Sequence, residues 1–94
     1  MASVYILYSA EIDRFYIGSC ENLETRLSQH LNHEFSDSYT SKANDWILFF
    51  ALENLGYVQA RLIEAHIKKM RTRTYYQNLK TYPEISEKLI EKYK

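Results

Sequence analysis

Two short apolar runs, each carrying a tyrosine, constrain the fold of this 94-residue chain more than any other feature. The first run covers residues 3–9 and the second covers residues 15–19, and both are rich in residue types that favour strands. Only a short connection around Glu11-Ile12-Asp13 separates them. The chain is therefore expected to begin with an antiparallel β-hairpin.

The register of this hairpin decides where its two tyrosines lie. An even-numbered loop that pairs Ser9 with Arg14 sets Tyr5 opposite Gly18. Tyr16 then lies diagonally across from Tyr5 on the same face, within reach of it. Because Gly18 has no side chain, it should leave open space above Tyr5, which predicts a pocket there.

A helix is expected to follow, from a cap at Asn22 to about Asn32. Its core stripe consists of leucines spaced four residues apart: Leu23, Leu27 and Leu31. At about 100° per residue, Arg26 and His30 fall along one margin of this stripe. Two polar side chains are thereby held at the edge of the core, where a functional site could be built.

The second half of the chain begins with a loop and then predicts a strand and a long helix. Residues 33–45 lack periodicity, whereas the near-continuous apolar stretch Trp46–Leu52 is typical of a strand covered on both faces. A helix over Tyr57–Arg71, capped by Asn54, is expected to pack heavily. Its wide apolar arc comprises Val58, Leu62, Ile63, Ala65, Ile67 and Met70. Glu64 lies at the border of that arc.

Two shorter helices are expected at the end, over Thr74–Lys80 and from Pro83 onwards. The predicted fold is α/β of the α+β type, with a small, mainly antiparallel three-stranded sheet flanked by helices. We expect one domain, residues 1–94, in which residues 83–94 form a C-terminal helix appended to the core.

Composition favours a globular protein of a reducing compartment. Apolar residues make up 46% of the chain and charged residues 26%, which is ordinary for a soluble domain. The single cysteine, Cys20, cannot form a disulfide within the chain. No signal-peptide pattern follows Met1 and no apolar run is long enough to cross a bilayer, so we expect a cytoplasmic protein without a membrane partner.

The charges balance, with twelve basic and twelve acidic residues. This counts against a nucleic-acid partner, because phosphate contacts usually leave a basic surplus. The charges are nevertheless uneven, with one basic cluster of Lys68, Lys69, Arg71 and Arg73 and one acidic group of Glu84, Glu87 and Glu91. A neutral total can conceal a basic face, although it predicts weak unaided affinity.

Four segments carry a resemblance to a known family: Val4-Tyr5-Ile6, Tyr16-Ile17-Gly18, Asn22-Leu23-Glu24-x-Arg26-Leu27-x-x-His30 and Ala60-x-x-x-Glu64-x-x-Ile67-Lys68. In this order they resemble the GIY-YIG nuclease superfamily, whose small domains cut phosphodiester bonds in nucleic acid. The likeness runs from Val4 to about Lys80 and is strongest to small stand-alone members. Val4 is the one departure, since the first motif has glycine there, and that glycine is not a catalytic group.

The resemblance implies a metal-dependent endonuclease acting on DNA, with a site of five residues. Tyr5 would help to activate the attacking water with His30 as its partner, and Tyr16 would position the water or the scissile phosphate. Arg26 would stabilise the charge that develops at the phosphorus centre. Glu64 would hold one Mg²⁺ or Mn²⁺ ion, which polarises the phosphate and stabilises the leaving oxygen.

Four further residues are weaker candidates for substrate binding: Gly18, Lys42, Lys68 and Asn78. Lys42 follows Thr40 and Ser41 in a polar segment that resembles one often found near the family's site. Asn78 is similar to an asparagine that some members have near the phosphate, although the neighbouring Tyr75-Tyr76-Gln77 matches poorly.

Each site residue also has an ordinary structural explanation. Tyrosines favour strands and pair across hairpins. Arg26 could be a solvated helix residue, His30 a hydrogen-bonded histidine at the core edge, and Lys42 a solvated loop lysine. Glu64 could simply pair with Lys68 four residues later, in the favourable orientation.

Other functions and partners also fit the sequence. A catalytically weak nucleic-acid-binding or protein-interaction module could have the same fold, and an RNA-directed nuclease could have the same site. If the substrate is DNA, including branched or damaged DNA, a targeting protein partner or a homodimer is expected. A neutral chain binds weakly alone, and one small site cuts both strands only as a dimer or by two nicks.

Overall fold

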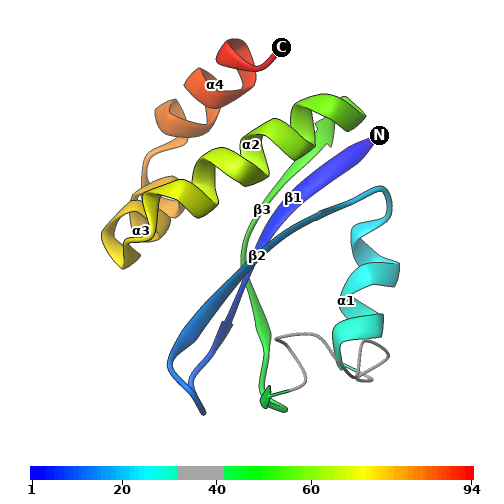
Figure 1. Ribbon diagram of the computed structural model, residues 1–94, viewed down its shortest axis with the longest axis vertical. Helices are drawn as coiled ribbons and strands as arrows, with labels where there is room; N and C mark the ends of the chain where they lie inside the picture. Colours follow the sequence, from blue (N-terminus) through cyan, green and yellow to red (C-terminus); the bar gives the residue numbers. More distant parts are fainter. Residues whose placement is uncertain (32–41) are drawn as a thin grey trace.

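The computed structural model describes residues 1–31 and 42–94, and only the backbone of residues 30 and 31 (Figure 1). The elements are β1 (Ala2–Ser9), β2 (Arg14–Cys20), α1 (Leu23–Leu31), β3 (Ile47–Leu55), α2 (Tyr57–Met70), α3 (Arg73–Thr81) and α4 (Pro83–Lys92). The strands form one antiparallel sheet in the order β2-β1-β3. The predicted α+β fold, a three-stranded antiparallel sheet flanked by helices, is confirmed.

The hairpin has the register that its loop length predicts. Ser9 pairs with Arg14, and Tyr5 pairs with Gly18. Tyr16 lies opposite Leu7, two pairs further towards the turn. The two tyrosines are therefore diagonal neighbours on one face of β1 and β2.

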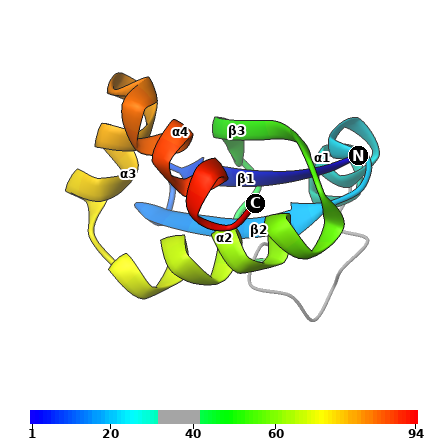
Figure 2. The ribbon, with the colours of Figure 1, turned by 90° about the horizontal axis from the view of Figure 1, so that it is seen from above.

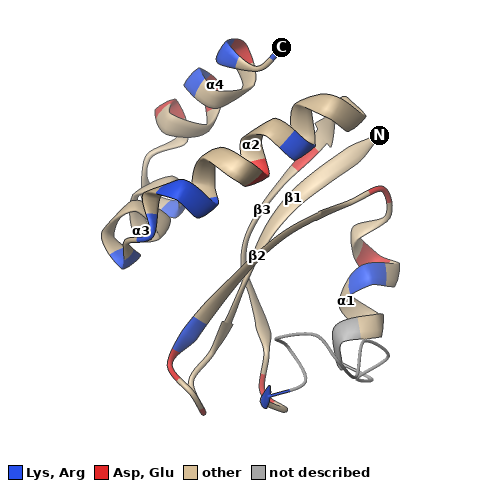
Figure 3. Ribbon diagram, viewed as in Figure 1, with Lys and Arg blue, Asp and Glu red and all other residues tan. Residues whose placement is uncertain are grey.

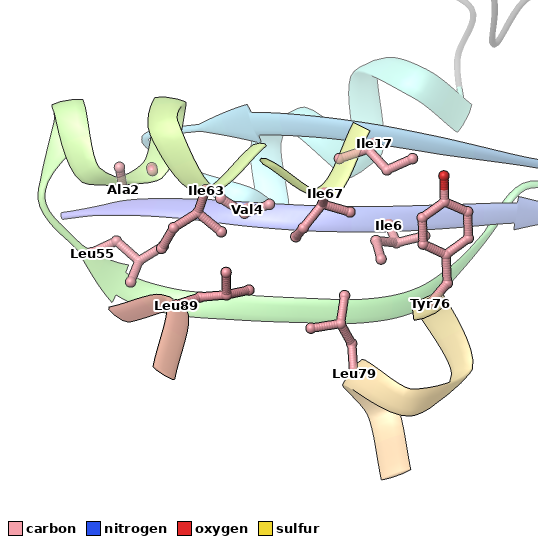
Figure 4. Packing of buried hydrophobic residues seen from close by; sticks show 11 residues of the cluster. Ala2, Val4, Ile6, Ile17, Leu55, Ile63, Ile67, Tyr76, Leu79 and Leu89 are labelled. Carbon is pink, nitrogen blue, oxygen red and sulfur yellow. The ribbon is translucent and has the colours of Figure 1, made fainter. Parts of the chain in front are cut away.

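The central strand β1 separates two packed layers. Val4 and Ile6 belong to the larger core, which they share with side chains of α2, α3 and α4 (Figure 4). Tyr5 and Leu7 point to the other face, where they pack with Trp46 and with Leu23 and Leu27 of α1. Figure 1 shows α2, α3 and α4 gathered together with α1 apart from them, and Figure 2 shows α2 running alongside β2.

The prediction that Trp46–Leu52 forms a strand covered on both faces is wrong. Strand β3 begins at Ile47 and lies at an edge of the sheet, where Ile47 is 60% exposed and Leu48 is 43% exposed. The strand covered on both faces is β1, whose residues 2–7 are all buried. An apolar run shows that a strand can be buried, but only its pairing partners decide which strand becomes central.

Two predictions about α2 are also corrected. Its N-cap is Gly56, whose N–H donates to the side-chain oxygen of Gln59 at 2.9 Å, whereas Asn54 lies in β3 with a φ of 62°. The buried face is narrower than the predicted arc, and comprises Ala60, Ile63 and Ile67. Four members of that arc are exposed instead: Val58, Leu62, Ala65 and Met70. The sheet and α4 cover one side of the helix only.

The remaining helix boundaries follow local chemistry. The Thr25 N–H donates to Asn22 Oδ1 at 3.0 Å, so the predicted cap of α1 is confirmed. Thr72 caps α3 by accepting from the Tyr75 N–H at 3.2 Å, and Pro83 is the first residue of α4. Among the described residues, no helix is both long and apolar enough to cross a membrane.

Candidate active site

Tyr5 and Tyr16 lie together on the face of the hairpin that meets α1. Their ring centroids are 6.3 Å apart and the ring planes are tilted by 35°. Tyr5 is 0% exposed, whereas Tyr16 is only half-buried. Tyr16 is therefore the member of the pair that a bound molecule can reach.

Gly18 makes room for the Tyr5 side chain. A Cβ atom added to Gly18 would lie 2.5 Å from the Tyr5 hydroxyl oxygen and 2.7 Å from Tyr5 Cζ. The space above Gly18 is thus filled by the phenol, and the pocket expected there is absent from this part of the described structure. The glycine permits close packing, and a larger residue would displace Tyr5.

Arg26 extends from α1 to the hydroxyl of Tyr5. Its guanidinium donates a hydrogen bond to that hydroxyl, and the Arg26 side chain is half-buried. Burial raises the pKa of Tyr5 well above its usual value, the nearby Tyr16 raises it further, and Arg26 opposes both. The phenol is accordingly neutral at neutral pH in this arrangement and serves as an acceptor for Arg26.

Glu64 is the carboxylate that faces β2 from α2. The Ser19 hydroxyl donates to Glu64 Oε1 at 2.5 Å, and Lys68 Nζ lies 2.7 Å from Oε2. The expected pairing of Glu64 with Lys68 is therefore present. The hydrogen bond from Ser19 also ties Glu64 to the sheet, which an ordinary ion pair on a solvated helix surface does not require.

Ser19 lines the cleft described below and contacts Glu64, and it is a candidate site residue that the sequence did not predict. It follows Gly18 in β2, so its side chain points to the opposite face from the tyrosines, towards α2. The signal that could have found it is this alternation, combined with the expected packing of the glutamate-bearing helix on the same hairpin.

A cleft of about 440 Å³ lies between α1 and α2, beside the end of β2. Arg26 contributes from α1, Ser19 from β2, and Tyr57 and Arg61 from α2. The other lining residues are Ala2, Cys20, Glu21, Asn22, Thr25, Gln29 and Ala60. Because β2 is an edge strand, groups from both faces of the sheet meet here, and a ligand in the cleft could touch Arg26 and the partner of Glu64 together.

The other candidate residues lie apart from this cleft or outside the described structure. The side chain of His30 is not among the described side chains, although its backbone lies in α1, and Thr40 and Ser41 fall outside the described residues. Lys42 is exposed just before β3. Asn78 is half-buried in α3, and its backbone carbonyl accepts from the Tyr82 N–H at 2.7 Å.

Part of the basic cluster is neutralised within the fold. Figure 3 shows basic residues towards the C-terminal end of α2 and on α3. Arg73 pairs with Asp13 of the hairpin turn at 2.7 Å, and Lys68 pairs with Glu64. Both of these cations are already partnered before any phosphate arrives.

The family comparison agrees with this arrangement of the hairpin and its helices. The model of the GIY-YIG catalytic domain matches residues 1–81. This chain belongs to the GIY-YIG family. Members of the family are nucleases and generally depend on a divalent metal ion. Searches of curated proteins and of solved structures found no match to this GIY-YIG chain.

The chemistry around Glu64 suits a divalent cation of the hard, oxygen-binding kind. Its side chain is 20% exposed, and Lys68, at 54%, is free enough to turn away and release Oε2. Among the described residues, no group of three or more histidine, cysteine or acidic side chains is arranged so that it could hold a metal ion. Mg²⁺ does not need one, because it is commonly held by one or two carboxylates together with waters and substrate phosphates.

Proposed function

We propose that this GIY-YIG protein is a divalent-metal-dependent endonuclease that hydrolyses phosphodiester bonds in DNA. The observation that carries the proposal is that Arg26 and Ser19, the hydrogen-bond partner of Glu64, line one cleft at the edge strand. A permanent cation and a held carboxylate from opposite faces of a sheet suit a phosphate better than they suit a neutral ligand.

Glu64 would hold one Mg²⁺ or Mn²⁺ ion, with Lys68 displaced towards solvent and Ser19 still orienting the carboxylate. Such an ion, when bound, polarises a phosphate and stabilises the charge on the leaving oxygen. The structural contribution of the chain is the orientation of Glu64, which is fixed from β2 before any ion binds.

Arg26 would bind the scissile phosphate. Its guanidinium is always charged and can present two parallel N–H donors to phosphate oxygens. Tyr5, buried beneath it, holds the guanidinium by accepting one hydrogen bond. The group is thereby oriented in advance towards the charge that develops in the transition state.

Tyr16 and His30 would handle the attacking water. Tyr16 is accessible beside Tyr5 and would position the water or the phosphate. The assignment of Tyr5 and His30 as the pair that activates water follows from the family resemblance. For Tyr5, that role requires the bound phosphate and ion to counteract the burial that raises its pKa.

A second candidate function is a nucleic-acid-binding or protein-interaction module with weak turnover. Two observations favour it: the charge balance of the chain, and the occupation of both Glu64 oxygens by Ser19 and Lys68. In that case the fold would bind DNA without cutting it, and a partner protein would bring it to its target.

The decisive experiment is cleavage of a mixed panel of labelled substrates in Mg²⁺ or Mn²⁺. The panel contains linear duplex DNA, branched DNA, single-stranded DNA and single-stranded RNA, and compares wild type with Glu64→Ala. The proposal expects cleavage of DNA by wild type alone, with the variant still folded. Salt-sensitive DNA binding without cleavage by either protein would favour the binding module. Cleavage of RNA alone would mean that the protein is an RNA-directed nuclease.

A further inference from the structure

The first turns of α2 present an exposed tyrosine–arginine pair to the cleft. Tyr57 is 55% exposed, and Arg61 Nη2 donates to its hydroxyl oxygen at 2.9 Å. The Arg61 guanidinium carbon lies 5.2 Å from the centre of the Tyr57 ring. Neither residue belongs to the two hydrophobic clusters of the described residues.

This pair lies on the same helix face as the Glu64 carboxylate. Tyr57, Arg61, Glu64 and Lys68 follow one another at spacings of four, three and four residues, which places them in one row along α2. Glu64 lies seven positions after Tyr57, a rise of about 10 Å along the helix axis. A strand of nucleic acid that runs along this row would reach Glu64 and Tyr57 with neighbouring nucleotides.

The cleft connects the pair to the other half of the site. Tyr57 and Arg61 line the same cavity of about 440 Å³ as Arg26 and Ser19. This volume lies within the range of small-ligand sites, about 300–1,000 Å³. Arg26 and Arg61 are thus two guanidinium groups facing one space from different helices.

An ordinary explanation is that Tyr57 and Arg61 form a surface pair that supports the helix. Side-chain pairs of this kind stabilise a helix by only about 0.2–0.5 kcal/mol. Such a small gain does not explain why an aromatic ring lies exposed beside a cleft. Exposed aromatic rings next to cationic side chains are the usual means of binding unpaired bases, which stack on the ring while the cation contacts the backbone.

We propose that Tyr57 and Arg61 form a subsite for an unpaired nucleotide beside the scissile phosphate. A base would stack on the exposed part of the Tyr57 ring, and Arg61 would contact a neighbouring phosphate. Bases inside an intact duplex have their faces covered by stacking and cannot use such a ring. The inference rests on the proposed function and narrows its substrate class to DNA with unpaired nucleotides at the cut, such as flaps, gaps or branch points.

The test is equilibrium binding of two fluorescent DNAs, one fully paired and one with a single-stranded flap, in EDTA so that nothing is cut. Wild type is expected to bind the flap more tightly. Tyr57→Ala should weaken flap binding about 5-fold to 150-fold, from a stacking loss of about 1–3 kcal/mol, and change duplex binding less than about twofold. Tyr57→Phe, which keeps the ring, should bind the flap nearly as wild type does.

Arg61→Ala should lower the affinity for both DNAs and reduce the slope of log affinity against log salt by about 1. Leu62→Ala is the matched control, because Leu62 is 45% exposed on the same turn and does not line the cleft. Thermal melting checks that each variant is folded, and Tyr57→Leu, which keeps apolar bulk without an aromatic face, replaces Tyr57→Ala if that variant unfolds.

Equal binding of flap and duplex by wild type would overturn the subsite, as would a Tyr57→Ala variant that keeps the full preference for the flap. If the protein is not a nuclease, wild type will not cut DNA in Mg²⁺, but Tyr57→Ala will still weaken flap binding in EDTA.

Discussion

At the scale of single residues, the site depends on one close contact inside the hairpin. The Tyr5 phenol fills the space over Gly18 and accepts a hydrogen bond from Arg26. Arg26 in turn faces the cleft. A side chain introduced at Gly18 should therefore disturb Arg26 through Tyr5.

Gly18→Ala is expected to destabilise the protein by about 1–3 kcal/mol, because the new methyl group would overlap the Tyr5 ring and force it to move. Urea unfolding measures the loss of stability, and the cleavage rate should fall with it as Arg26 loses its support. Gly56→Ala is the matched control, because a Cβ atom added there would lie 3.7 Å from its nearest neighbour. The loss of stability in this variant should stay below about 1 kcal/mol. Equal stability of Gly18→Ala and wild type would contradict the described packing.

Ser19→Ala is expected to leave Glu64 oriented only by Lys68. Loss of a hydrogen bond that orients a metal ligand typically costs about 10-fold to 100-fold in metal affinity or activity. The Mg²⁺ concentration for half-maximal cleavage should rise accordingly, and direct calorimetric titration of Mn²⁺ should show the same loss without substrate. Ser19→Thr keeps the hydroxyl and should restore most of the affinity, whereas an unchanged titration in Ser19→Ala would remove Ser19 from the site.

At the scale of the elements, sequence patterns gave the hairpin register and the cap of α1 correctly because both depend on residues close together in the chain. The place of β3 at an edge and the narrow buried face of α2 were not predictable in this way. Ile47 and Val58 are as apolar as their buried neighbours, and only the distant strands and helices decide which of them is covered. Ser19 was missed for the same reason, since its partner Glu64 is 45 residues away.

The packing of α2 against the C-terminal segment includes a histidine whose pKa is lowered in the folded protein. His66 Nδ1 lies 2.9 Å from the Tyr93 hydroxyl, and burial lowers the pKa of His66, with Lys92 and Lys69 lowering it further. Between the lowered pKa and the usual value of about 6.5, the unfolded chain binds a proton that the folded chain does not. Stability should therefore fall as the pH falls through this window.

His66→Gln should flatten that dependence, because the variant has no group to titrate there. The free energy of unfolding in urea, measured from about pH 5 to about pH 8, gives the slope for each protein. The expected result is a stability loss on acidification that is smaller in the variant than in wild type. Identical pH profiles for the two proteins would show that His66 titrates alike in the folded and unfolded chains.

At the scale of the whole molecule, all of α4 lies beyond the part of the chain that the family model matches. That match ends at residue 81, yet Leu89 of α4 is 4% exposed and belongs to the main core with Val4 and Ile63. Gln59 Nε2 also donates to the Ile90 carbonyl at 3.0 Å. We propose that residues 1–94 form one domain in which α4 completes the core.

Leu89→Ala should therefore destabilise the protein by about 2–5 kcal/mol, the usual cost of truncating a buried leucine. Leu62→Ala removes the same atoms from an exposed position and should cost much less. Thermal unfolding compares them, since each kcal/mol shifts the midpoint of a domain of this size by about 4–8 °C. Similar midpoints for the two variants would mean that α4 adds little to the core.

We propose that Glu64 holds the metal ion of a DNA-cutting site. The most direct measurement is the cleavage rate of labelled DNA by wild type and Glu64→Gln over a series of Mg²⁺ concentrations, with EDTA and then restored Mg²⁺ as a final step. Wild type should cut only when the ion is present, and Glu64→Gln should be slower by about 10²–10³-fold with an unchanged unfolding midpoint. Cleavage by Glu64→Gln at the wild-type rate, or by wild type in EDTA, would show that cleavage does not depend on a metal ion held by Glu64.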